Sequence, residues 1–194
     1  MLFLCLTSTN EYGPVKDNDL LDELIIGVAN NDKEAFNLLY EKTSVSVYSF
    51  ALSILKNLHD AEDVLQDCFI SIYDSASEYR SYGKPMAWII TIVKNLCLKK
   101  LRDRKKEPEP LSDNTDISFS DNGSVTAEDK ILLTMCMNVL SDEERQIVVL
   151  HAVSGFRHKE IAQILSMQLS TVLSKYNRAL KKLRKNMTKG EQDV

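Results

Sequence analysis

The amino-acid sequence predicts an all-α protein in which two small helical domains are joined by a flexible acidic linker. Six glycines and four prolines in 194 residues leave little for a turn-rich β architecture. Apolar residues recur at helical spacing over most of the chain. One segment, residues 107–127, combines Pro, Ser, Asp and Asn with little apolar content, which is typical of a linker.

The linker defines the domain organisation that we expect. Residues 1–19 are predicted to be disordered, residues 20–106 to form the first domain and residues 128–188 to form the second. The apolar start, MLFLCL, is too short for a signal-peptide core or a membrane span. We therefore expect no insertion into a membrane, and the widely separated cysteines favour a reducing cytoplasm.

The first domain begins with two apolar helical runs between residues 20 and 58. The clearest periodicity follows, because eight residues lie on one face of an amphipathic helix: Ala61, Val64, Leu65, Cys68, Phe69, Ile72, Tyr73 and Ala76. Pro85 suits the first turn of the next helix, where its missing N–H costs nothing, and this helix is expected to end near Arg104.

The second domain contains four predicted helices. The first covers residues 131–140. Ser141 and Glu144 have the spacing of a capping box that opens the second, which is expected to end near Val153. Two further helices are predicted at residues 158–165 and 170–186, with Ser170 as a candidate cap of the last one.

The net charge of −4 hides a strong asymmetry along the chain. Residues 84–106 carry 8 basic side chains and 1 acidic one, and residues 157–189 carry 9 basic side chains and 1 acidic one. Between these blocks, residues 107–129 carry 7 acidic side chains and no basic one. Two cationic blocks in an otherwise acidic protein indicate two contacts with a polyanion.

The residues that carry chemistry in enzymes are poorly represented. The four cysteines, at positions 5, 68, 97 and 136, are far apart and lack the spacing of a zinc site. Acidic pairs such as Asp63 and Asp67 are accompanied by no glycine-rich phosphate loop. We therefore expect no catalysis, no metal and no cofactor.

The last two predicted helices have the pattern of a helix-turn-helix. Ala162 is the small residue needed where the second helix crosses the first, and the outer face of the second helix is polar and basic. In this geometry the N-terminal half of that helix faces base edges and its later lysines face phosphates. The alternative interpretation is a solvated cationic face on an ordinary terminal helix.

The helix near residues 86–104 combines an aromatic ring, an amide and cations on one face, formed by Trp88, Thr91, Ile92, Asn95, Lys99 and Arg102. This chemistry suits single-stranded nucleic acid, which needs stacking, base-edge hydrogen bonds and attraction to phosphates. The loop before it adds Tyr79, Arg80, Tyr82 and Lys84. The alternative is that Trp88 is a core residue.

The segment AEDVLQDCF, residues 61–69, places its apolar face inward and leaves acidic and amide side chains outside: Glu62, Asp63, Gln66, Asp67 and, one helical turn beyond the segment, Asp74. A solvated helix face and an acidic docking surface for a basic partner are both consistent with this pattern.

The order of these parts resembles the bacterial sigma factors, and specifically their extracytoplasmic-function group. The resemblance covers about residues 30–188 and depends on AEDVLQDCF, the later Trp88 and Asn95, and the L-S-D-E-E-R…G…E-I-A…T-V…R-A…L pattern from Leu140 to Leu183. It implies a transcription initiation factor that binds core RNA polymerase and promoter DNA, both duplex and single-stranded.

The resemblance also implies roles for individual residues. Docking onto the clamp helices of the polymerase β′ subunit falls to Asp63, Gln66 and Asp67. Contacts with the −10 element, including a base flipped into the 79–84 loop, fall to Tyr79, Arg80, Tyr82, Lys84, Trp88, Asn95, Lys99 and Arg102. Contacts with the −35 element fall to Thr171, Ser174, Lys175, Asn177, Arg178 and Lys182. The second domain would also touch the polymerase β flap, and many relatives are held inactive by an anti-sigma factor.

Three positions depart from the family pattern. Ser166 occupies the turn where glycine is common, and Leu173 stands where a basic residue is common, which points away from guanine and toward a thymine methyl group. Asn177 carries an amide that suits adenine. Two alternatives remain open: a helix-turn-helix regulator that acts on duplex DNA without polymerase, and a helical interaction protein that binds no DNA.

Overall fold

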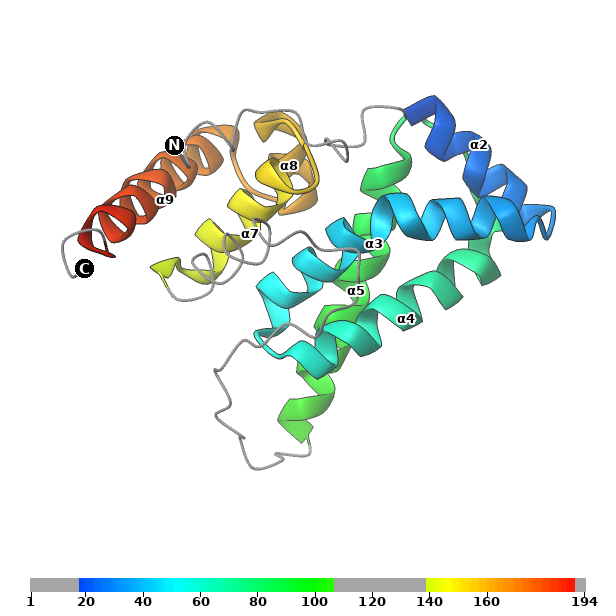
Figure 1. The fold of residues 1–194 in the computed structure, drawn as a ribbon, viewed down its shortest axis with the longest axis horizontal. Coiled ribbons are helices and arrows are strands. Elements are labelled where there is room, and N and C mark those ends of the chain that lie inside the picture. The colour runs from blue at the N-terminus through cyan, green and yellow to red at the C-terminus, as the bar shows by residue number, and fades with distance from the viewer. Residues whose placement is uncertain (1–17, 107–138, 191–194) are drawn as a thin grey trace.

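The computed structural model describes residues 18–106 and 139–190, and within these ranges the regular structure is entirely helical (Figure 1). Predictions for residues 1–17, for the linker 107–127 and for the helix at 131–138 lie outside the described residues. The all-α class is confirmed.

The helices form two groups, the N-lobe (18–106) and the C-lobe (139–190). Their elements are α2 Asn18–Ala29, α3 Lys33–Leu55, α4 Leu58–Ser75, the short 3₁₀ helix η1 Ala76–Glu78, α5 Pro85–Lys106, α7 Asp142–Ala152, α8 His158–Ile164 and α9 Leu169–Gly190.

A tight turn joins α2 to α3. Asn31 adopts a left-handed conformation with φ 61°, which closes the end of α2 and lets the Asp32 N–H donate to the Gly27 carbonyl at 3.0 Å. The Asp32 carboxylate then caps α3 by accepting from the N–H groups of Glu34 and Ala35. A Cβ at Gly27 would lie 2.6 Å from the Ala35 Cβ, so this close crossing of the two helices requires glycine.

Helix α3 is the centre of the N-lobe, because α2, α4 and α5 all pack against it. Its large apolar residues, including Leu39, Phe50 and Leu52, are buried, and so are four of its serines, Ser44, Ser46, Ser49 and Ser53. Small hydroxyl side chains allow neighbouring helices to approach closely. The backbone carbonyl of Ser53 accepts a hydrogen bond from Arg145 Nε of the other lobe at 3.0 Å.

Helix α4 has the predicted amphipathic form. Five of its predicted inward residues, Ala61, Val64, Cys68, Phe69 and Ile72, are buried, and Leu65 is half-buried. Tyr73 differs from the prediction because its side chain is exposed and its hydroxyl donates to Asn31 Oδ1 at 2.7 Å. Burial raises the pKa of the Cys68 thiol and of the nearby Cys97 thiol to about 12.

The C-lobe begins with the predicted capping box. The Ser141 side chain accepts from the α7 backbone, and Glu144 Oε2 accepts from the Ser141 N–H at 3.1 Å. Helix α9 begins at Leu169, so the prediction that Ser170 caps this helix is wrong by position, and Ser170 lies in its first turn. An apolar cluster of Leu140, Val148, Ala179 and Leu183 joins α7 to α9.

The two lobes pack directly on each other, which the sequence does not predict. Helix α7 lies against α3, and α8 lies against α5 (Figure 1). Apolar residues of the C-lobe, among them Ile147, Leu150 and Ile161, belong to the same buried cluster as the core of the N-lobe. Among the described helices, none is both long enough and apolar enough to cross a bilayer.

Candidate nucleic-acid interface

The turn between α8 and α9 has the geometry of a helix-turn-helix with an unusual residue. Ser166 adopts φ 56°, and the N–H groups of Ser166 and Met167 donate to the carbonyls of Gln163 and Ala162 at the end of α8. This is the arrangement in which glycine is strongly preferred, because other side chains are strained in the left-handed region. The glycine that the resemblance leads us to expect at this turn therefore has a backbone cause, and Ser166 keeps the turn in spite of the strain.

Helix α9 turns its apolar face to the C-lobe core through Val172, Ala179 and Leu183, as predicted. Its outer face bears most of the residues predicted to contact the −35 element. Ser174, Asn177 and Arg178 are exposed, and Thr171 is half-buried. Leu169 and Leu173 are also exposed on the N-terminal half of the helix, by 43% and 41%.

Two predicted DNA contacts on α9 have carboxylate partners inside the protein. Lys175 forms an ion pair with Glu143, and Lys182 Nζ lies 2.6 Å from Glu144 Oε2. Both acids come from the first turn of α7. Burial on its own would raise the pKa of Glu144, but the hydrogen bonds with Lys182 and Ser141 outweigh it and lower that pKa. These lysines therefore help to fasten α9 to α7.

An aromatic cluster supports the first half of α9 from within. The rings of His151 and His158 stack with centroids 4.5 Å apart, and Tyr176 of α9 meets both rings edge-on. His151 Nδ1 lies 2.8 Å from the Phe156 carbonyl. Burial, together with the neighbouring His151, lowers the pKa of His158, so the neutral imidazole fits this cluster best.

The 79–84 loop is anchored by a carboxylate that sequence reasoning missed. Asp22 of α2 is buried and accepts from the Tyr79 hydroxyl, and from the Ser81 hydroxyl at 2.6 Å. Burial and the hydrogen bond to Asp22 raise the pKa of Tyr79. The Tyr79 ring lies 4.7 Å from that of Trp88, so these two predicted DNA residues are packed on each other rather than fully exposed.

The other predicted residues of this region are accessible. Tyr82 is 84% exposed, and Arg80 and Lys84 are exposed beside it. Farther along α5, Asn95, Lys99 and Arg102 are all exposed on one face. The structure thus brings the predicted −10 residues into one continuous region that begins at the loop and continues along α5.

The acidic face of α4 borders the basic end of α5. Lys100 Nζ lies 3.0 Å from Asp60 Oδ1 and 2.6 Å from Asp63 Oδ2, and Arg104 also pairs with Asp60. Asp63, a predicted polymerase contact, therefore has an internal partner. Gln66 and Asp67 are exposed on the same helix, next to Ile70, which is 59% exposed.

Sequence reasoning could have found some of the missing residues. Asp60 lies in the first turn of α4, which comes before the basic α5, and Glu144 lies in the first turn of α7, two helices before the basic α9. An acidic first turn before a basic helix is a signal available in the sequence. Asp22 and Lys94 carry no such signal, because their partners are 57 or more residues away. Among the described residues, no cluster of three or more His, Cys, Asp or Glu side chains could hold a metal ion.

Comparison with known proteins agrees with this arrangement. Residues 39–107 match Sigma-70 region 2, and residues 130–183 match Sigma-70 region 4. The extracytoplasmic-function RNA polymerase sigma factor SigK of Mycobacterium ulcerans is 26% identical over 180 residues, which cover 89% of this chain and 96% of that protein. SigK of Mycobacterium tuberculosis is 27% identical over the same lengths.

Two solved structures share the fold. The sigma factor RpoE of Bartonella quintana, in complex with the anti-sigma factor NepR, matches 80% of this chain and 98% of its own, with 22% identity and a TM-score of 0.63. CnrH, in complex with the cytosolic domain of CnrY, matches 87% of this chain and 97% of its own, with 20% identity and a TM-score of 0.58.

Two successive domains that match regions 2 and 4 define a two-domain promoter-recognition protein. The chain belongs to the sigma-70 family of RNA polymerase sigma factors and, within it, to the extracytoplasmic-function group.

Proposed function

We propose that this promoter-specific initiation factor uses three separate surfaces, one for core RNA polymerase and two for promoter DNA. The polymerase surface is the acidic side of α4. The −10 surface is the 79–84 loop with the outer face of α5, and the −35 surface is the outer face of α9. The observation that carries the proposal is that each family-matched lobe exposes one basic helix, while α4 exposes acidic residues.

The polymerase surface is centred on Gln66 and Asp67. Both are exposed, and Ile70 supplies an apolar contact one turn away. Asp63 would contact the polymerase while it keeps its ion pair with Lys100. An acidic face of this kind fits a basic partner surface, which in this proposal is the clamp helices of the β′ subunit. The β flap would contact the C-lobe.

The −10 surface has two parts: a fixed base of packed aromatic rings, and exposed side chains that would contact DNA. Tyr79 and Trp88 form the base, because they are packed together and anchored through Asp22. Tyr82 and Arg80 extend from the loop and would stack on and hold a base flipped from the non-template strand. Stacking on an aromatic ring contributes about 1–3 kcal/mol per base. Asn95, Lys99 and Arg102 would then contact base edges and phosphates along α5.

The −35 surface has a mixed chemistry. Leu169, Leu173 and Asn177 follow one another at intervals of one helical turn, and Arg178 is exposed beside them. In the major groove, an apolar side chain contacts the thymine methyl group and an amide pairs with adenine. We therefore propose that the N-terminal half of α9 reads a −35 element containing A·T pairs, with Thr171, Ser174 and Arg178 completing the contact.

The proposed activity consists of binding alone. The chain would act in the cytoplasm as a subunit of the polymerase holoenzyme, with no cofactor and no reaction of its own. Two DNA contacts and one polymerase contact within one chain reinforce each other through effective concentration.

Run-off transcription with purified core polymerase tests the function. The wild type should give promoter-specific transcripts from a library of bacterial genomic fragments. Asp67→Lys should lower affinity for core polymerase by about fivefold or more, since one interface charge contributes roughly 1 kcal/mol. Glu41→Lys, an exposed charge reversal on α3, is the matched control and should behave as the wild type. Binding to duplex DNA with no transcript from any fragment would instead favour a regulator that works without polymerase.

A base analogue tests the thymine contact. Replacing thymine by uracil removes only the methyl group, so wild-type affinity for a selected −35 duplex should fall by about fourfold, given about 0.8 kcal/mol for each buried methyl-sized group. Leu173→Ala should bind both duplexes equally. Leu98→Ala, an exposed leucine on α5, should retain the wild-type difference. A wild type indifferent to uracil would contradict the contact.

A further inference from the structure

Helix α2 holds the loop between η1 and α5 near both of its ends. Near the start of the loop, the Asp22 carboxylate accepts from the Tyr79 hydroxyl and, at 2.6 Å, from the Ser81 hydroxyl. Near its end, Asn18 Nδ2 donates to the Gly83 carbonyl at 3.0 Å. Asn18 and Asp22 are one helical turn apart and lie on the same side of α2. One side of a single helix therefore fixes the conformation of the loop.

The packing of α2 places the Asp22 carboxylate against the loop. Leu21 and Ile25 are fully buried in the core that α2 shares with α3, which fixes the rotation of the helix about its axis. Asp22 itself is only 9% exposed, and its Oδ1 and Oδ2 each accept from one hydroxyl of the loop. A buried carboxylate is costly without hydrogen-bond donors, so the bonded position of the loop is favoured over one that moves away.

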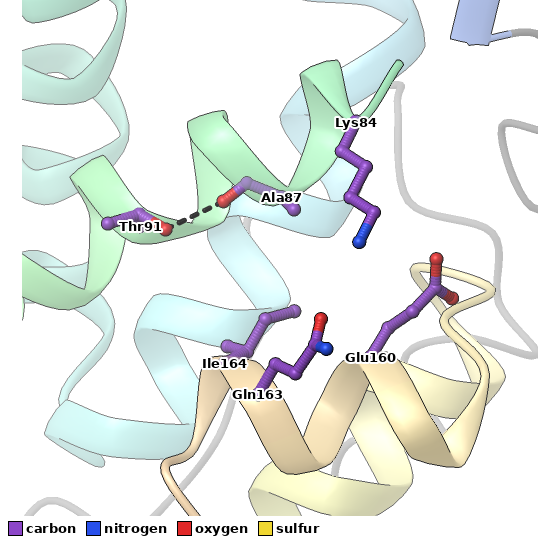
Figure 2. A pocket seen from close by; sticks show the side chains of 6 residues that line it. All are labelled: Lys84, Ala87, Thr91, Glu160, Gln163 and Ile164. Carbon is purple, nitrogen blue, oxygen red and sulfur yellow. Dashed lines mark hydrogen bonds between the residues drawn. The ribbon is translucent and has the colours of Figure 1, made fainter. Parts of the chain in front are cut away.

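The anchored loop leaves two of its side chains for DNA. It begins in an extended conformation, with φ −59° and ψ 134° at Tyr79, in which successive side chains point to opposite sides. Arg80 and Tyr82 alternate in the sequence with the two residues that α2 holds, and both are exposed. Lys84, by contrast, points across a cavity of about 200 Å³ toward Glu160 of α8 (Figure 2). Holding alternate residues thus directs Arg80 and Tyr82 away from α2.

We propose that Asn18 and Asp22 are positioning residues for base capture, which hold the loop in its DNA-binding conformation before DNA arrives. Both precede residue 39, where the match to Sigma-70 region 2 begins. A loop that is already ordered loses less conformational entropy on binding, so more of the stacking free energy contributes to affinity. Neither residue touches the base. The inference rests on the proposed capture of a flipped base, whereas the contacts between α2 and the loop do not depend on that role.

The fluorescence of Trp88 reports the position of the loop in the free, full-length protein. Trp88 is the only tryptophan in the sequence, and its ring centroid lies 4.7 Å from that of Tyr79. Asp22→Ala removes both acceptors, and Ser81→Ala removes one donor at an exposed position, where folding is least affected. Both variants should increase the quenching of Trp88 by acrylamide. Asp19→Ala, the same change at an exposed position of α2, is the matched control and should behave as the wild type.

A base analogue and an abasic site measure the contribution of base capture. Holoenzyme is mixed with a selected promoter whose non-template −10 strand carries 2-aminopurine at one position at a time, and its fluorescence rises where a base leaves the stack. An abasic site at that position then removes only the captured base. The affinity of wild-type holoenzyme should fall by about fivefold or more, as expected when one stacked base is lost.

The positioning variants should lose this preference for the base selectively. Asp22→Ala and Ser81→Ala should reduce the preference by about fivefold, the cost of ordering one mobile side chain, with unchanged affinity for the abasic strand. Asp22→Asn keeps one acceptor oxygen for the Tyr79 hydroxyl and should restore part of the preference. The Asp22→Ala/Ser81→Ala variant should lose no more than Asp22→Ala alone, because Ser81 acts through Asp22.

Three outcomes would overturn the proposal. Unchanged quenching in Asp22→Ala would show that the loop keeps its position without the carboxylate. Increased quenching with an unchanged preference would show that capture does not need the anchored loop, and an equal loss of affinity for both strands would show a general structural role. Failure of the proposed function is recognised separately, because wild-type holoenzyme would then be indifferent to the missing base whatever the fluorescence of Trp88 shows.

Discussion

Helices α5 and α9 are both basic, and each forms ion pairs along one edge with an acidic neighbouring helix, but they differ in what lies beside their proposed DNA-binding faces. Lys100 of α5 is held by Asp60 and Asp63 of α4, and Lys182 of α9 is held by Glu144 of α7. The outer face of α9 is exposed beyond its ion pair with Glu144, whereas the first half of α5 has α8 beside it, across a cavity lined by Lys84 and Thr91. Charge pattern locates both helices, but only packing between the lobes places a neighbouring helix beside one of them.

The Glu144–Lys182 and Asp63–Lys100 ion pairs also differ in how deeply their carboxylates are buried. Glu144 is 3% exposed and has a second task in the capping box of α7, whereas the Asp63 side chain is 61% exposed. The position of α9 therefore depends on a buried carboxylate, and that of α5 depends mainly on apolar packing through Ile89, Ile90 and Val93. We therefore expect substitutions in the Glu144–Lys182 ion pair to lower the free energy of unfolding more than substitutions in the Asp63–Lys100 ion pair.

Glu144→Ala should produce the largest change. It removes the capping box and leaves Lys182 without its partner, so the free energy of unfolding should fall by about 2–4 kcal/mol. Urea denaturation followed by circular dichroism measures this loss. The adjacent Glu143→Ala, which removes only a surface ion pair, should cost no more than about 1 kcal/mol. Equal losses of unfolding free energy in the two variants would contradict the importance of the buried Glu144 carboxylate.

Arg178→Ala should produce an intermediate effect, and on DNA rather than on folding. Discrimination between a selected −35 duplex and a scrambled one should fall by about 1–3 kcal/mol if the guanidinium makes a bidentate base contact. Fluorescence anisotropy at fixed salt measures both affinities. Lys181→Ala, one turn along the exposed side, should weaken both duplexes alike. Unchanged discrimination with Arg178→Ala would exclude this residue from base reading.

Ser166→Gly should produce the smallest effect, and a favourable one. Glycine relieves the left-handed strain of the helix-turn-helix turn, so the melting temperature should rise by an amount that corresponds to about 0.5–1 kcal/mol. In the N-lobe, Asn31→Gly should raise the melting temperature less, because asparagine tolerates this conformation better and because the substitution removes the acceptor of the Tyr73 hydroxyl. Differential scanning calorimetry compares the two. A loss of stability with Ser166→Gly would mean that the serine side chain has a role beyond the turn.

The sequence predicts local structure well where one helix determines the outcome. The inward face of α4, Pro85 at the start of α5, and the capping box at Ser141 all follow from spacing within a few residues. The predicted exposure of Asn95 and Arg178 agrees with the structure for the same reason. The order of the two domains is predicted as well, since it depends on motifs and not on packing.

The sequence fails where a partner comes from a distant helix. Lys175, Lys182 and Asp63 have the character of free contacts, yet each has an ion-pair partner on a neighbouring helix. Arg145 looks like a surface residue of an acidic helix start, and its partner Ser53 is 92 residues away. The serine-rich face of α3 likewise has a polar pattern, and only packing against other helices explains its burial.

The carboxylate partners of α9 have a further consequence for counterion release. Each phosphate neutralised by a protein cation steepens the fall of DNA affinity with salt, with a slope of about −0.9 per contact on a log–log scale. Residues 157–189 contain 9 basic side chains, but Lys175 and Lys182 are already compensated by Glu143 and Glu144. The salt dependence of duplex binding should therefore correspond to fewer phosphates than the basic content suggests. A larger share of the affinity would then depend on base sequence, as a promoter-selective subunit requires.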